Sequence, residues 1–564
     1  LDGAGTLGRI YESLVLYPKA TSQIAKTILS PVTHMRNFVS AGAFAAANGI
    51  LPFADKQAIK NAYQALQTPL KGTRQQNELY QELLELGVVN SNVRLGDLTR
   101  LMEDVNFGET MTSDKGMRLL LKPLSKLKSV SQDLYTAEDD FWKIYSWAME
   151  KSRIEKAFEK IGVTRGQFFK RADGTEVRLT EDFLKREAAD IVKNNIPNYD
   201  YVSDFVKSLR KLPIGNFVSF PAEIVRTGTN IVRRGLREIN ETFTLADGTV
   251  VKPFETIGYT RLFGFGTTVA AVPYATQKAF QAIYDVTDEE REALRRYVAD
   301  WSKNSTLLPI KDEEGNFKYV DFSHANAYDT LVRPIQTILN QVADGRTDED
   351  GMMDDFIAGM FGSMKEFAQP FISESIWTEA VADIIARGGR TRDGFQVFNP
   401  QDTSGDKAYK IMAHLVEAQM PFSLNQLKRL DQSIESVDVL QKGKIDKFGQ
   451  TYEFGDEFAG LFGFRSVAVN PDRTLKFKVA NYQRGVRESR QLFTREALRG
   501  GPIDPSEIVD AYLNANRALF ENQKAFKQDL DAARILNITE SGFYDATDRI
   551  SNVALGAIDE NIFR

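Results

Sequence analysis

Apolar residues that recur every three, four or seven positions dominate this sequence and limit what it can fold into. Between Val130 and Phe158 they are Leu134, Phe141, Ile144, Trp147, Ala148, Ile154 and Phe158. This spacing places them on one helix face. The stretch is long enough for one long helix or for a helix pair.

A second helix has a clear start signal near the end of the chain. Asp504 is a suitable N-cap residue, and Pro505 suits the first helical position. Apolar residues continue at helical spacing at Ile508, Ala511, Tyr512, Ala515, Leu519 and Phe526. We therefore predict a long amphipathic helix from Pro505 to about Leu536.

Short hairpins interrupt the helical pattern. The segments 168–179 and 242–251 each carry an Asp-Gly pair between alternating stretches, which is typical of a tight hairpin turn. Two further hairpins are expected at 307–322, around Glu314-Gly315, and at 445–454, around Phe448-Gly449. Such small hairpins must pack on helices to be stable. The predicted fold class is mostly α, an extended multi-helix bundle with a few small β-hairpins.

Composition changes little along the 564 residues, so it does not mark sharp domain boundaries. Segments rich in glycine and charge at 344–351, 386–394 and 499–502 are typical of loops. We predict an N-terminal helical region (1–165), a helical region with hairpins (166–345), a helical region with one hairpin (346–500), and a C-terminal long helix with a tail (501–564).

Composition argues against several kinds of site. The chain has no cysteine, which excludes disulfides and thiolate metal sites, and its three histidines lie far apart in sequence. The formal net charge of -6 does not predict that the whole surface binds nucleic acid. We therefore predict no metal site and no cofactor.

The motifs of common enzymes are missing from the sequence. The segment nearest to a phosphate-binding loop, Gln441-Lys442-Gly443-Lys444-Ile445, has isoleucine where that loop needs a hydroxyl. No Gly-x-Ser-x-Gly turn occurs. His324 follows Asp321 and Ser323 too closely for the geometry of a catalytic triad. We predict no catalytic residues and a protein that is not an enzyme.

Two arginine series have helical spacing. The first is Arg226, Arg233, Arg234 and Arg237, and the second includes Arg484, Arg487 and Arg490. One interpretation is a stripe that binds phosphate groups or a protein partner. The other is a solvated helix face with intrahelical ion pairs, for example to Glu488. The sequence leaves both interpretations open.

Two uncharged segments are rich in small residues, 38–53 and 262–275. Both are shorter than the ~18 apolar residues that a membrane-spanning helix needs. They are expected either to be buried core helices or to become membrane-competent later in the life of the protein. Small residues suit both roles because they permit close helix packing.

The segment Thr27-Ile28-Leu29-Ser30-Pro31-Val32-Thr33-His34-Met35-Arg36-Asn37-Phe38-Val39-Ser40 resembles a helix start in very large phage-encoded virion proteins. These are the large polyvalent proteins and the internal or ejected virion proteins. The segments 217–226 and 301–309 are similar, and all three together cover a small part of the chain. Pro31, Arg36 and Asn37 are then expected to serve helix packing.

The resemblance implies a structural component of a phage virion, an internal core or genome-ejection protein. Because the chain starts at Leu1, we expect a processed segment of a longer chain. It would be made in the host cytoplasm and lie in the virion interior. The implied partners are other virion proteins, including portal or core proteins, and further copies of itself, with DNA and the host membrane as additional candidates. The alternatives are a cell-wall-cleaving enzyme or an RNA-polymerase-associated segment of a large virion protein.

Overall fold

A computed structural model shows a chain made mostly of helices, with two small antiparallel sheets among the residues it describes. The predicted fold class is therefore confirmed. The structure describes residues 31–67, 77–89, 115–202, 219–298, 302, 305–312, 314–322, 328, 351–352, 354–355, 376–391, 396–399, 401–419, 466–497 and 505–551. The hairpin predicted at 445–454 and the loop at 499–502 lie outside these residues, as does nearly all of the loop at 344–351.

The chain divides into two compact units, each built from stretches that are distant in sequence. Unit 1 comprises 1–274 and 322–465, and unit 2 comprises 275–321 and 466–564. The four consecutive regions expected from the sequence stay a prediction. Each unit is described below by itself.

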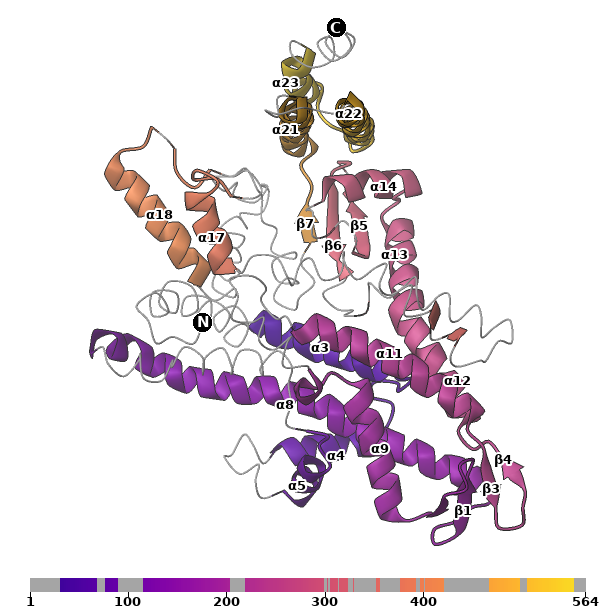
Figure 1. Ribbon diagram of the computed structural model, residues 1–564. Helices are drawn as coiled ribbons and strands as arrows, with labels where there is room; N and C mark the ends of the chain where they lie inside the picture. Colours follow the sequence, from indigo (N-terminus) through magenta and orange to yellow (C-terminus); the bar gives the residue numbers. More distant parts are fainter. Residues whose placement is uncertain are drawn as a thin grey trace. The chain divides into compact units, whose positions relative to one another are not determined.

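Unit 1 is organised around one long helix, α8 (Lys115–Lys160). The periodic stretch 130–158 thus belongs to a single helix. Around α8 lie α3, α4 and α9, and α11 packs against α9 and α12 (Figure 1). The bounds of these helices are α3 Pro31–Ala47, α4 Lys56–Gln67, α5 Glu78–Glu85, α9 Glu181–Asn195, η4 Tyr199–Tyr201, α11 Ser219–Asn240 and α12 Glu255–Gly266.

The two hairpins predicted in this unit are confirmed, and they join into one sheet. Its strand order is β2-β1-β3-β4, with β1 Phe168–Arg171, β2 Glu176–Arg178, β3 Phe243–Leu245 and β4 Val250–Val251. Gly174 and Gly248 occupy the turns with positive φ, as the Asp-Gly pairs require. The sheet packs on α8 through Phe158, whose ring lies 4.9 Å from that of Phe169 and 5.8 Å from that of Phe243.

The two small-residue segments meet inside the core of unit 1. A Cβ atom on Gly264 would lie 2.4 Å from the Cα of Gly49, so only glycine permits this approach. Ala45 and Ile50 of the first segment and Leu262 and Phe265 of the second are buried in the same cluster. The packing agrees with the interpretation of both segments as core helices. Among the described residues, no helix is long and apolar enough to cross a membrane.

Beyond Gly266 the helix continues through a π-helical turn, η6 (Thr267–Ala271), into α13 (Val272–Ile283). Later in the chain, α17 (Ile376–Ile385) and α18 (Ser404–Gln419) pack on each other. The buried Asp383 of α17 links them, because its carboxylate contacts His414 of α18 at 3.0 Å. The same carboxylate contacts Arg387, just after α17, at 2.5 Å. The loop predicted at 386–394 is confirmed for its described residues 386–391.

Unit 2 combines a three-stranded sheet with a long helical hairpin. The sheet has the order β5-β6-β7, with β5 Leu307–Lys311, β6 Phe317–Asp321 and β7 Ser466–Ala468. The hairpin predicted at 307–322 is therefore confirmed, and β7 adds a strand that the sequence did not indicate. Most of α13 belongs to this unit, and the remaining helices are α14 Asp288–Tyr297, α21 Pro471–Ala497, α22 Pro505–Ile535 and α23 Glu540–Ser551.

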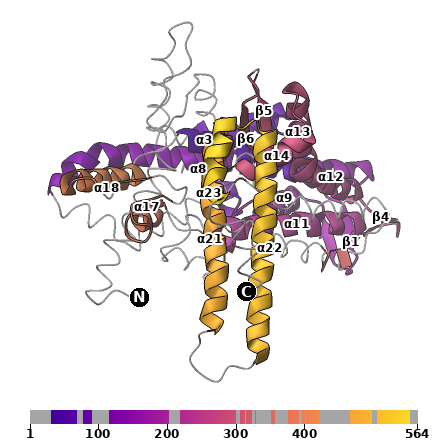
Figure 2. The ribbon, with the colours of Figure 1, turned by 90° about the horizontal axis from the view of Figure 1, so that it is seen from above.

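The helices α21 and α22 run side by side in opposite directions (Figure 2). The rings of Tyr482 and Phe526 stack with centroids 4.5 Å apart, and Asn522 donates a hydrogen bond to the Tyr482 carbonyl. The start of α22 at Pro505 and its end at Ile535 confirm the helix predicted from the sequence.

We expect Gly264→Ala to destabilise unit 1 by about 1–3 kcal/mol, because the added methyl group would overlap the backbone of Gly49. Thermal unfolding followed by circular dichroism measures the effect. Gly405→Ala on α18 is the matched control, since its Cβ would have no neighbour closer than 4.0 Å. Equal melting temperatures for the two variants would contradict the close packing of α3 and α12.

Candidate functional site

An alternating chain of arginines and glutamates runs through unit 1 and links α8, α12, α11, α9 and β1. In order, its members are Arg153, Glu150, Arg261, Glu238, Arg234, Glu187 and Arg171. Each of the three glutamates forms ion pairs with the arginines on both sides of it, so every charge in the series has at least one partner of opposite sign. We refer to this group as the Arg–Glu chain.

Arg261 lies at the centre of the Arg–Glu chain with a side chain that is 0% exposed. Its Nε and Nη2 donate to the two carboxylate oxygens of Glu238 at 2.9 and 2.8 Å. Its Nη1 donates to Glu150 Oε1 at 2.9 Å and to Asn48 Oδ1 at 3.0 Å. Such a bidentate arrangement suits the planar guanidinium group and fixes its orientation.

The protonation of this centre follows from its neighbours. Burial disfavours the charged form of Arg261, but Glu150 and Glu238 outweigh it and raise the pKa of the guanidinium. Burial likewise works against the ionised form of Glu150, whereas Arg153 and Arg261 lower its pKa from 4.5 to about 2. Both partners are therefore charged at neutral pH.

The other end of the Arg–Glu chain reaches the surface. Arg234 contacts Glu187 at 2.6 Å, and Arg171 of β1 contacts the same carboxylate at 3.2 Å. Despite the cost of burial, Arg234 and Arg171 hold the pKa of Glu187 below its ordinary value. Glu187 and Arg171 also line a groove, so the buried chain of charges ends at an open surface feature.

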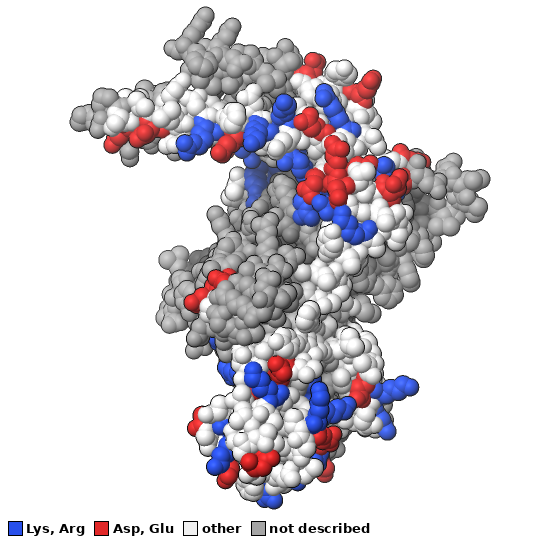
Figure 3. Space-filling model, turned by 90° about the vertical axis from the view of Figure 1, so that its right-hand side faces the viewer, with Lys and Arg blue, Asp and Glu red and all other residues white. Residues whose placement is uncertain are grey.

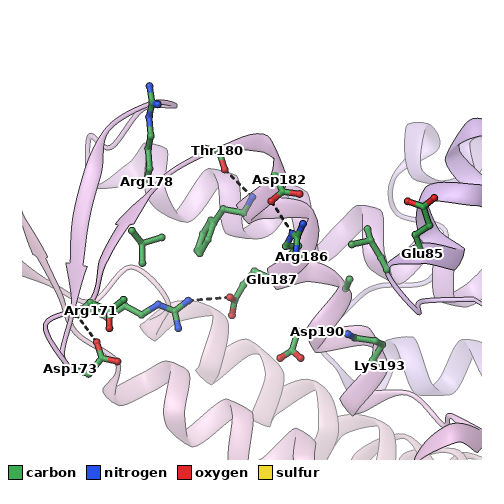
Figure 4. A pocket seen from close by; sticks show the side chains of 15 residues that line it. Glu85, Arg171, Asp173, Arg178, Thr180, Asp182, Arg186, Glu187, Asp190 and Lys193 are labelled. Carbon is green, nitrogen blue, oxygen red and sulfur yellow. Dashed lines mark hydrogen bonds and ion pairs between the residues drawn. The ribbon is translucent and has the colours of Figure 1, made fainter.

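This groove lies between the β1–β2 hairpin and α9, has a volume of about 730 Å³ and is closed on one side by the end of α5 (Figure 4). Most of its polar groups serve the fold. Arg186 pairs with Asp182 at 2.9 Å, and Thr180 caps α9 by accepting from the amide of Phe183. Asp173 accepts from the amide of Thr175 and so fixes the hairpin turn.

The groove also exposes acidic and basic groups of its own, including Glu85 and Lys193 (Figure 4). The apolar residues Leu86, Val177 and Phe183 line the groove together with charged groups of both signs. Among the described residues, no group of histidines and carboxylates has the arrangement of a metal site.

The arginines predicted to bind phosphate or a partner on α11 divide into two pairs. Arg226 donates to both carboxylate oxygens of Glu223 and to the carbonyl of Asn194 at 2.9 Å. It therefore satisfies the C-terminal end of α9, and Arg234 belongs to the Arg–Glu chain. Arg233 and Arg237 are exposed.

The remaining predicted residues are placed as follows. Arg484 and Arg487 are exposed on α21, and the side chain of Arg490 lies outside the described part of the chain. Pro31 is the first residue of α3, and Asn37 is buried on that helix. The side chains of Pro31 and Arg36 are not among those described.

The sequence analysis missed the centre of the Arg–Glu chain. Glu150, Glu238 and Arg261 come from separate helices, and the contact of Arg261 with Asn48 joins residues 213 positions apart. One signal was present in the sequence. Arg261 is the only charged residue between Glu255 and Lys278, an otherwise uncharged helical stretch, which marks it as a charge that needs a buried partner.

Comparison of the chain with known protein families, with curated proteins and with solved structures gave no match.

We expect Glu238→Leu to lower the free energy of unfolding by about 3–5 kcal/mol, because Arg261 and Arg234 would each lose a buried partner. Urea unfolding followed by tryptophan fluorescence measures this change. Glu159→Leu, an exposed position on α8, serves as the control and should stay within about 0.5 kcal/mol of the parent chain. A small effect at Glu238 would mean that water compensates the buried arginines.

Acid should weaken unit 1 through Glu150. Its pKa in the folded protein is about 2, below the ordinary 4.5, so its contribution is fully present above pH 4.5 and is lost as pH falls toward 2. Burial raises the pKa of Glu241, so protonation of this carboxyl stabilises the fold as the pH falls, which is opposite to the effect of Glu150. Unfolding free energies measured between pH 5 and pH 2.5 should therefore fall less steeply for Glu150→Gln than for the parent chain. Parallel curves would contradict the assignment.

Proposed function

We propose that this chain is a structural assembly protein of a phage particle, an internal core or genome-ejection protein that acts through binding. One observation carries the assembly role. The arginines of α11 divide into residues neutralised within the fold, Arg226 and Arg234, and residues left exposed, Arg233 and Arg237. The first pair holds neighbouring elements together, and the second pair leaves positive charge for a partner.

The phage context rests on the resemblance of residues 27–40 to large virion proteins. The charge distribution favours local contacts over general binding to DNA. Lys and Arg side chains lie among Asp and Glu side chains over the described surface of the face in Figure 3. The described residues on that face therefore form no extended positive patch. The proposed partners are therefore neighbouring virion proteins of the portal or core and further copies of this chain, with DNA phosphates as local contacts.

Arg233→Glu with Arg237→Glu should leave the fold intact and impair assembly, because both side chains are exposed. Mass spectrometry of purified particles gives the copy number of the variant chain, and thermal unfolding of the purified chain checks the fold. Lys156→Glu, which reverses an exposed charge on α8, is the control and should be incorporated normally.

Arg234→Glu tests an arginine that the fold itself uses. The substitution places a third carboxylate beside Glu187 and Glu238, so we expect unit 1 to unfold, unlike in the variant with the two exposed arginines reversed. Normal copy number and infectivity of the Arg233→Glu, Arg237→Glu particle would assign these arginines to a solvated face. Absence of the parent chain from particles would overturn the virion role itself.

A further inference from the structure

The helix α22 has two apolar faces, and among the residues that the structure describes only one of them packs within unit 2. Ala515, Leu519 and Phe526 are buried on the inner face, which lies against α21. On a second face, Val509 and Leu513 are each 55% exposed and Phe520 is 65% exposed. Exposed apolar residues that line up along one helix indicate an interaction surface.

The spacing on this second face is that of a coiled-coil seam. Val509, Leu513, Asn516 and Phe520 follow one another at intervals of four, three and four residues, which are the a and d positions of a heptad repeat. We call these four residues the α22 seam. Asn516 is the one polar residue of the α22 seam, and its side-chain amide donates to the carbonyl of Tyr512 in the same helix at 2.9 Å.

Charge next to the α22 seam indicates which partner fits. Asp510 and Arg517 are exposed and lie on the same side of the seam, both at e positions. They are seven residues apart, about 10 Å along the helix axis, so they cannot pair with each other within one chain. In an antiparallel helix pair, however, e positions face e positions.

We propose that the α22 seam binds the α22 seam of a second copy of this chain, antiparallel, about a two-fold axis between residues 514 and 515. In this register Val509 lies opposite Phe520 of the second copy, and Leu513 lies opposite Asn516 of the second copy. The symmetry repeats each contact, as an isologous interface requires.

The same register places Asp510 beside Arg517 of the second copy, and the two-fold axis generates this ion pair twice. A parallel pairing in register would place each e position beside the g position five residues earlier, where Pro505 and Tyr512 offer no countercharge to Asp510 and Arg517. The charges therefore select the antiparallel arrangement.

This inference rests on the proposed assembly role, and it names the surface through which copies of the chain contact each other. Its experiment uses the purified full chain without particles. If the purified chain stays monomeric, the inference is wrong. The proposed phage role is then still tested separately, by whether the chain is incorporated into particles. A chain that dimerises but is absent from particles overturns the phage role instead.

Sedimentation velocity over a micromolar concentration series should show a monomer–dimer equilibrium. Leu513→Glu with Phe520→Glu should weaken dimerisation at least 100-fold, because charges would enter the apolar seam. Tyr544→Glu on α23, an aromatic residue that is 67% exposed, is the matched control and should dimerise like the parent chain. A monomer at every concentration, or a seam variant that dimerises normally, would overturn the proposal.

A charge swap tests the register. Asp510→Arg alone and Arg517→Asp alone should each weaken the dimer about tenfold, since each brings like charges together across the seam. The double variant should regain most of the affinity of the parent chain. Absence of this rescue would show that the two residues do not face each other across the interface.

The lack of cysteine in the chain allows a direct test of direction. Under mild oxidation, an equal mixture of Val509→Cys and Phe520→Cys chains should form the mixed disulfide, identified by peptide mass spectrometry. Within one chain these positions are about 16 Å apart along the helix, too far for a disulfide. Disulfides between two Val509→Cys chains would establish a parallel pairing and overturn the proposed arrangement.

Discussion

The packing of unit 1 depends on the buried guanidinium group of Arg261. A charge without contact to water is strongly unfavourable unless it is paired and fully hydrogen-bonded. Arg261 meets that condition only because α8 supplies Glu150, α11 supplies Glu238 and the end of α3 supplies Asn48. Any displacement of one of these elements would leave a donor or a carboxylate without its partner. The ion pairs thus restrict the helices to one relative arrangement.

Glycines make this arrangement sterically possible. A Cβ atom on Gly258 would lie 2.5 Å from the carbonyl oxygen of Gly235, so α12 and α11 approach each other at a position where neither has a side chain. Arg261 lies one turn beyond Gly258 and Glu238 lies one turn beyond Gly235. The close approach of the two backbones therefore allows the bidentate contact between their charged side chains. Gly49 and Gly264 play the corresponding part between α3 and α12.

Local patterns predicted the elements of this fold well, and they failed where distant segments meet. Apolar spacing indicated α8 and α22, and Asp-Gly pairs indicated the two hairpins of unit 1, because these features depend on neighbouring residues. Periodicity carries no information on pairing between hairpins, so the contact of Phe169 with Leu245, which joins them into one sheet, could not be foreseen. The same limit applies to the Arg–Glu chain, because the isolation of Arg261 in the sequence indicates a buried partner but not which residues supply it.

The arginines of α11 show why a charge series is ambiguous until its surroundings are known. At the level of sequence, Arg226, Arg233, Arg234 and Arg237 are equivalent candidates for a binding face. In the fold, Glu223 and the carbonyl groups at the end of α9 engage Arg226, while Glu187 and Glu238 engage Arg234. A guanidinium with buried carboxylate partners would have to give up those contacts to bind phosphate, and the cost would exceed the gain from an exposed contact. In the proposed assembly role, the arginines of this helix that remain available to a partner are therefore the exposed Arg233 and Arg237.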